Sequence, residues 1–71
     1  SAIVRATFSN EALLAVEAAH SGEIVAAKKP STVQTVRLET LPQGPFWLRL
    51  YVTGPVFPAQ TQLTDLKIET E

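Results

Sequence analysis

The residues best suited to chemistry lie in one short stretch, FWLRLYV, which spans residues 46–52 and holds the chain's single tryptophan and single tyrosine. Successive side chains of a β-strand point to opposite faces, so a strand here places Trp47, Arg49 and Tyr51 on one face. Aromatic rings stack on the apolar C–H faces of sugars, and an arginine between them can donate several hydrogen bonds. The opposite face is expected to fill the core with Phe46, Leu48, Leu50 and Val52.

Three kinds of partner suit this Trp/Arg/Tyr row. At about 3.3 Å per residue, Trp47 and Tyr51 lie about 13 Å apart, so a ligand that contacts both exceeds one monosaccharide. The same residue types are enriched at protein–protein interfaces. A third possibility is intramolecular packing, with loop 54–60 over the row and Phe57 on Trp47. The candidate ligand or interface residues are therefore Trp47, Arg49, Tyr51 and Phe57, and the three alternatives stay open.

Catalytic chemistry finds little support in the sequence. A nucleophilic triad needs a base, and His20, the only histidine, is expected in an exposed turn before Ser21 and Gly22. The seven acidic residues show no spacing that singles out a pair, and three scattered glycines cannot form a phosphate loop. Without cysteine, and with one histidine, a metal site is not predicted either. We expect no catalytic residue, no cofactor and no enzymatic activity.

Charge and hydropathy argue against two classes of partner. Six Lys and Arg residues against seven Asp and Glu residues give a formal charge of -1, and Lys28-Lys29 is the only basic pair. Binding to phosphate backbones needs a stripe of basic residues, which one pair does not form. Spanning a bilayer needs an apolar run longer than any in this chain. We therefore expect neither nucleic acid nor a membrane as partner. The absence of cysteine tolerates an oxidising exterior, and an extracellular or virion location is favoured.

Alternating apolar and polar residues predict a chain made largely of β-strands. Strands are expected over residues 2–8, 23–27, 32–41, 46–52 and 62–70. In these strands, Val36 and Leu38 lie on the face opposite their polar neighbours, and Leu66 and Ile68 are expected to face inward. Residues 11–19 fit either a helix capped by Asn10 or a strand that continues through a turn at His20–Gly22; the strand is favoured because the surroundings are β. Pro42 and Gly44 fit a type I turn, so strands 32–41 and 46–52 are expected to pair as an antiparallel hairpin.

The length of 71 residues allows one domain, near the lower limit for independent folding. Neither a disulfide nor a zinc site can strengthen so small a core, so contact with identical subunits is the expected supplement. The chain is expected to be a single domain, 1–71, with a complete small protein and a fragment or processed part of a longer chain as the two open alternatives. The fold class is all-β: a small antiparallel β-sandwich, jelly-roll-like, of five or six strands.

The second half holds three short alternating segments, VRL at 36–38, LRLYV at 48–52 and LTDLKIE at 63–69. A Pro–Gly turn, LPQGP at 41–45, separates the first from the second. Together, residues 33–70 resemble the closing strands of jelly-roll carbohydrate-binding modules. The resemblance implies a carbohydrate ligand and a structural calcium ligand at Asp65, for which the chain shows no convincing partner carboxylates. The expected function is a non-catalytic module that contacts oligosaccharide through the Trp/Arg/Tyr row. The alternative is a homo-oligomeric assembly domain of a secreted or viral fibre protein.

Overall fold

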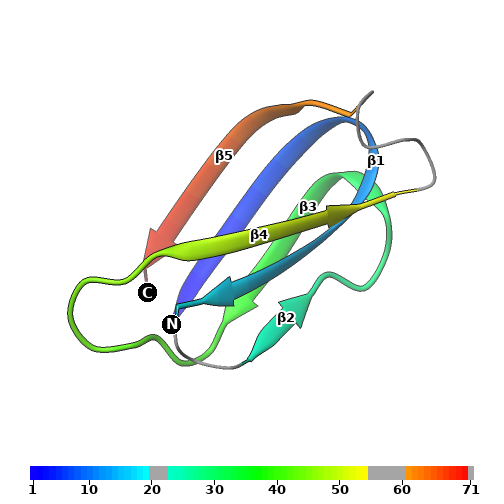
Figure 1. Ribbon diagram of the computed structural model, residues 1–71. Coiled ribbons are helices and arrows are strands. Elements are labelled where there is room, and N and C mark those ends of the chain that lie inside the picture. The colour runs from blue at the N-terminus through cyan, green and yellow to red at the C-terminus, as the bar shows by residue number, and fades with distance from the viewer. Residues whose placement is uncertain (20–22, 55–60, 71) are drawn as a thin grey trace.

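The computed structural model describes residues 1–19, 23–54 and 61–70, and all regular structure in these ranges is β (Figure 1). The strands are β1 (Ala2–Ala18), β2 (Ile24–Ala26), β3 (Ser31–Leu38), β4 (Leu48–Thr53) and β5 (Leu63–Thr70). The expectation of an all-β, antiparallel fold is confirmed, and residues 11–18 are strand rather than helix. The finer jelly-roll-like sandwich stays a prediction.

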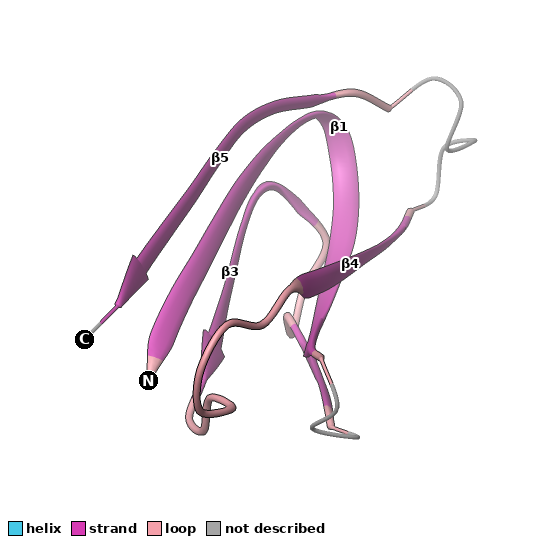
Figure 2. Ribbon diagram, turned by 60° about the vertical axis from the view of Figure 1, so that its left-hand side comes forward, coloured by secondary structure: helices cyan, strands magenta, loops and turns pink. Residues whose placement is uncertain are grey.

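Strand β1 organises the whole fold, because every other strand pairs with it and all of these pairings are antiparallel. Its first half pairs with β3 on one edge and β5 on the other, whereas its second half pairs with β2 and β4. The register with β3 shifts between Thr7 and Ala12, where β1 bends and doubles back (Figure 2). We call the two resulting layers the β5 layer (β3, first half of β1, β5) and the β4 layer (β2, second half of β1, β4).

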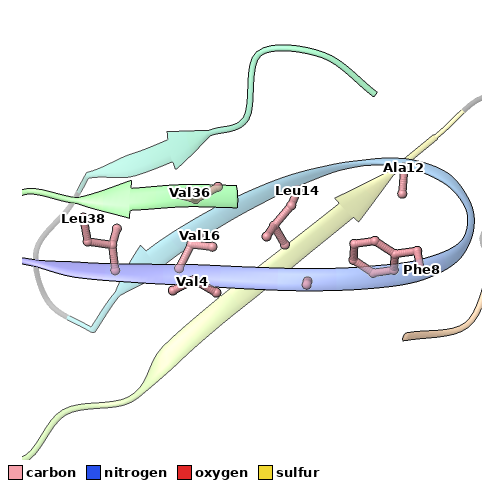
Figure 3. Packing of buried hydrophobic residues seen from close by; sticks show 8 residues of the cluster. Val4, Phe8, Ala12, Leu14, Val16, Val36 and Leu38 are labelled. Carbon is pink, nitrogen blue, oxygen red and sulfur yellow. The ribbon is translucent and has the colours of Figure 1, made fainter. Parts of the chain in front are cut away.

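The core lies between these two layers and is built mainly by β1 itself. Val4 and Phe8 of its first half face Leu14 and Val16 of its second half (Figure 3), and Ala6 belongs to the same cluster. Val36 and Leu38 of β3 complete the buried cluster, in line with the alternation expected for that strand. Strand alternation therefore selects which side chains are inside, because each half of β1 turns every second residue to the other half.

The expected hairpin between strands 32–41 and 46–52 is wrong. Strand β3 pairs with the first half of β1 and β4 pairs with the second half, so the two strands lie in opposite layers. Their connection carries Pro42 and Pro45, which cannot donate to a ladder, and Gly44 with a φ of 77°. The connection thus crosses between layers, and the long β1 supplies each strand with a partner that a local hairpin would otherwise provide.

The strands expected on either side of a turn at His20–Gly22 are paired in the structure. Ala15, Val16 and Glu17 of β1 pair with Ala26, Val25 and Ile24 of β2 in antiparallel register. The proposed turn at His20–Gly22 lies outside the described residues, and so does His20 itself.

Candidate functional site

The Trp/Arg/Tyr row lies on the outer face of the β4 layer, where the alternation of residues 46–52 predicts it. Arg49 is opposite Glu17 and Tyr51 is opposite Ala15, while Trp47 accepts a hydrogen bond of 2.9 Å at its carbonyl from the Ala19 N–H. Trp47 is 49% exposed and Tyr51 is 37% exposed. The row is therefore an open surface within the described part of the chain. Phe57, the fourth candidate, lies outside the described residues.

Arg49 links the row into one network. Its Nη1 donates to the Tyr51 hydroxyl at 3.3 Å, and this hydroxyl donates to Glu17 Oε1 at 3.2 Å. The guanidinium carbon lies 4.9 Å from the centroid of the Trp47 ring, which is within the range of a cation–π contact. The Tyr51 hydroxyl raises the pKa of Arg49 above its ordinary value, so the guanidinium stays charged. Glu17 joins the site as a residue that sequence reasoning missed.

The expected core face of the same strand is only half formed. Leu48 and Leu50 pack against the buried cluster, whereas Phe46 is 39% exposed and Val52 is 37% exposed. The prediction that all four side chains fill the core is therefore wrong for Phe46 and Val52. Phe46 lies before the start of β4, and Val52 is on the inner face of β4 at a side of the molecule that the described strands leave open.

This open side is bounded by β4 in one layer and β5 in the other, which flank the same side of β1 (Figures 1 and 2). On β5, Leu66 and Ile68 are opposite Ala6 and Val4, so their side chains point toward the interior. Both nevertheless stay 41% and 51% exposed, because the described part of the facing layer does not reach over them. Apolar side chains that point inward but stay in water are unfavourable for an isolated molecule.

The open side also presents backbone groups without a strand partner. In antiparallel sheets, alternate residues direct both their N–H and C=O to opposite neighbours. The Trp47 carbonyl faces β1, so the backbone N–H and C=O groups of Arg49 and Tyr51 face β1 as well. The same groups of Leu48, Leu50 and Val52 point away from β1. Among the described strands, none pairs with that edge of β4.

Strand β5 shows the same arrangement. The Thr7 carbonyl faces β5, where it accepts a hydrogen bond from the Thr64 hydroxyl, and Thr7 is opposite Asp65. Asp65 therefore directs its backbone groups to β1, while Leu66 and Ile68 direct theirs to the free edge. On both strands, the residues with inward apolar side chains are those whose backbone groups have no strand partner among the described residues, and we call these the free backbone groups. We define the open side by these residues: Leu48, Leu50, Val52, Leu66 and Ile68.

An apolar hollow of about 170 Å³ lies at the end of the open side nearest the bend of β1. Gly54 permits the close approach of the chain there, because a Cβ at this position would lie 2.8 Å from the Glu11 carbonyl oxygen. The hollow is lined by Phe8, Ala12, Val52, Thr53, Gly54, Thr61 and Leu63.

The opposite side of the molecule is closed, and a buried glutamine closes it. The Gln34 side chain, 2% exposed, accepts a hydrogen bond of 3.1 Å from the Leu14 N–H and donates one of 2.8 Å to the Lys29 carbonyl. A weaker contact of 3.3 Å reaches the Ser31 carbonyl. Gln34 thus joins the two layers beyond the end of β2, where its side chain takes up the Leu14 N–H while the Leu14 carbonyl accepts from the Ala27 N–H at 2.8 Å. Its place on the inner face follows from its shared parity with Val36 and Leu38.

Other classes of site find no support among the described residues. No three His, Cys, Asp or Glu residues of that part of the chain lie close enough to hold a metal ion. No helix in the same ranges could cross a membrane. Comparisons with models of known protein families, with curated proteins and with solved structures give no significant match to this chain.

Proposed function

We propose that the protein is a non-catalytic assembly module whose identical subunits associate through the open side. The observation that carries this proposal is the coincidence of exposed, inward-pointing apolar side chains and free backbone groups on both β4 and β5. An added strand would satisfy these backbone groups and cover the apolar side chains in one step, which is the physical basis of recognition by strand addition. The small core gives a further reason, because subunit contacts would add buried apolar surface to a domain near the lower size limit for independent folding.

The first prediction is that Val52→Lys weakens self-association at least about a hundredfold. Val52 points into the open side, so the ammonium group would be trapped without a counterion when a second subunit covers it. Burial of an unpaired charge costs several kcal/mol, and about 1.4 kcal/mol corresponds to a tenfold change in the dissociation constant. Sedimentation velocity over a series of protein concentrations measures the effect.

The matched control for this experiment is Val33→Lys. Val33 is also an exposed strand valine, at 50%, but it lies on β3, on the outer face of the β5 layer and away from the open side. This variant should associate as the unaltered protein does. A protein that stays monomeric at several hundred micromolar, or one that both lysine substitutions affect equally, contradicts the proposal.

Carbohydrate binding by the Trp/Arg/Tyr row is the second candidate function. It is favoured by the exposure of Trp47 and Tyr51 on either side of a guanidinium that Glu17 and Tyr51 hold in place. Sugar rings could stack on the two aromatic side chains while Arg49 donates hydrogen bonds to hydroxyl groups.

The second prediction tests this candidate through the fluorescence of Trp47, the only tryptophan of the chain. A panel of oligosaccharides longer than one sugar should contain at least one that changes the emission saturably. For that ligand, Tyr51→Ala should reduce affinity about 3- to 10-fold through the loss of one stacking contact. Phe46→Ala, which removes an exposed aromatic ring of the opposite parity, should leave affinity unchanged. An unchanged emission spectrum with every oligosaccharide excludes this function.

A further inference from the structure

The proposed self-association requires a defined pairing of the two copies, and the free edge of β4 offers one. We propose that two subunits pair β4 against β4, antiparallel, about a two-fold axis that passes through Leu50. This inference rests on the proposed function, because it specifies the contact by which identical subunits associate. The pairing would join the β4 layers of the two subunits into one continuous sheet through the free backbone groups of Leu48, Leu50 and Val52.

Charge favours β4 over β5 as the pairing edge. The outward face of β5 carries Asp65, Lys67 and Glu69 at every second position, the type of charged edge that discourages pairing. The corresponding face of β4 carries one charge, Arg49, and Glu17 of the neighbouring strand lies 4.0 Å from its guanidinium. A second copy can therefore approach β4 with a single compensated charge in each strand.

The same charge selects the register. A two-fold axis at Arg49 would place each guanidinium directly opposite the partner's Arg49, and like charges in opposite positions destabilise a strand pair. An axis at Tyr51 would leave Leu48 opposite Gly54 of the partner subunit, beyond the end of the partner's β4. An axis at Leu50 pairs β4 along its length and places Arg49 opposite the partner's Tyr51, a residue type that Arg49 already contacts within its own subunit.

Burial points to the same axis. Leu48 and Val52 lie on either side of Leu50 on the inner face, and the two-fold operation places each Leu48 beside the partner's Val52. The 37% exposed side chain of Val52 would thereby gain an apolar neighbour. On the outer face, the two Trp/Arg/Tyr rows would lie side by side across the axis and form one aromatic surface.

The third prediction is a disulfide pattern that reads the register directly. The chain has no cysteine, so each of five single substitutions at positions 48–52 provides one thiol per subunit. Only a residue on the axis lies opposite its own copy, with a Cα–Cα distance of about 5.5 Å in a hydrogen-bonded pair, inside the range that a disulfide bridges. Diagonal neighbours lie about 7–8 Å apart, beyond that range. Mild oxidation should therefore link Leu50→Cys into a covalent dimer at least tenfold faster than Arg49→Cys or Tyr51→Cys.

Each outcome of the oxidation experiment decides one part of the inference. Non-reducing electrophoresis measures the linked fraction, sedimentation under reducing conditions shows that each variant still associates, and oxidation in denaturant gives the unspecific rate. Fastest linkage at Arg49→Cys or Tyr51→Cys overturns the register but leaves self-association intact. Leu66→Cys and Ile68→Cys test the edge of β5 in the same way. Linkage only at these two positions, or no linkage in a protein that sediments as a dimer, overturns pairing through β4. A monomeric unaltered protein overturns the proposed function as well.

Discussion

Replacing Leu14 by alanine is expected to lower the free energy of unfolding by about 3–5 kcal/mol. Leu14 is fully buried between the two layers, where it contacts the cluster formed by both halves of β1 and by β3. The substitution removes buried apolar surface and leaves a cavity, because a backbone held by hydrogen bonds on either side of β1 cannot collapse into the space. A domain of this size has a total stability of about 4–10 kcal/mol, so the loss is a large part of it. Urea unfolding at low temperature measures the difference.

The neighbouring residue supplies the control for this substitution. Leu13 belongs to the same strand but points to the outer face of the β4 layer, opposite Thr53, and is only partly buried. Leu13→Ala should therefore cost clearly less, about 1 kcal/mol or below. Equal losses at the two positions would mean that the interior does not lie between the layers as described.

Local alternation in the sequence predicts the positions of most strands but only one of their pairings, that of β1 with β2. The alternation that sets Val36 and Leu38 apart from their polar neighbours agrees with the burial of both side chains. The spacing of Trp47, Arg49 and Tyr51 correctly places them on one face. Pairing depends on contacts between residues far apart in the chain, which local patterns do not encode. The hairpin expected around Pro42 was wrong for this reason, since both strands pair with β1 instead.

The length of β1 was the main feature that the sequence concealed. Ser9 and Asn10 resemble a break between two elements, yet the strand bends at these residues and continues to Ala18. Ser9 is held at the bend by the residue just before β5, since its N–H donates to the Gln62 carbonyl at 2.8 Å and its hydroxyl accepts from the Gln62 N–H at 2.8 Å. These contacts join residues separated by more than fifty positions. Polar residues that would end a strand in isolation can therefore continue one when a distant segment forms hydrogen bonds with their backbone groups.

The candidate sites differ in how far the sequence could reveal them. The Trp/Arg/Tyr row is a property of one strand, so its parity was readable, whereas Glu17 joins it only through the register between β1 and β4. The open side is a property of two strands that share no pairing, and no local pattern indicates it. Leu66 and Ile68 look like ordinary core residues in the sequence, and only the arrangement of the layers leaves them exposed.

Replacing Gln34 by glutamate is expected to make stability strongly dependent on pH. When protonated, the new carboxyl group can imitate the amide: its carbonyl accepts from the Leu14 N–H, and its hydroxyl donates to the Lys29 carbonyl. When ionised, it has no donor left and faces the carbonyl oxygens of Lys29 and Ser31 in a buried site. Burial and these oxygens both disfavour the charge, so the folded protein should hold the pKa of this group above the ordinary glutamate value of about 4.3.

The direction of the effect follows from proton binding. Above pH about 4.3 the unfolded chain releases the proton while the folded protein retains it, so stability relative to the unaltered protein falls by about 1.4 kcal/mol per pH unit until the folded group ionises. The loss at pH 7 should reach roughly 3 kcal/mol or more, whereas at pH 4 the variant should be close to the unaltered protein. Lys28 and Lys29 have exposed side chains and leave the buried charge without a close counterion.

Urea unfolding of both proteins between pH 4 and pH 7 measures the difference. Gln43→Glu, in the exposed connection before β4, is the matched substitution and should show no such pH-dependent loss of stability. A pH-independent difference for Gln34→Glu would mean that water reaches this side of the molecule, and that it is as open as the side between β4 and β5.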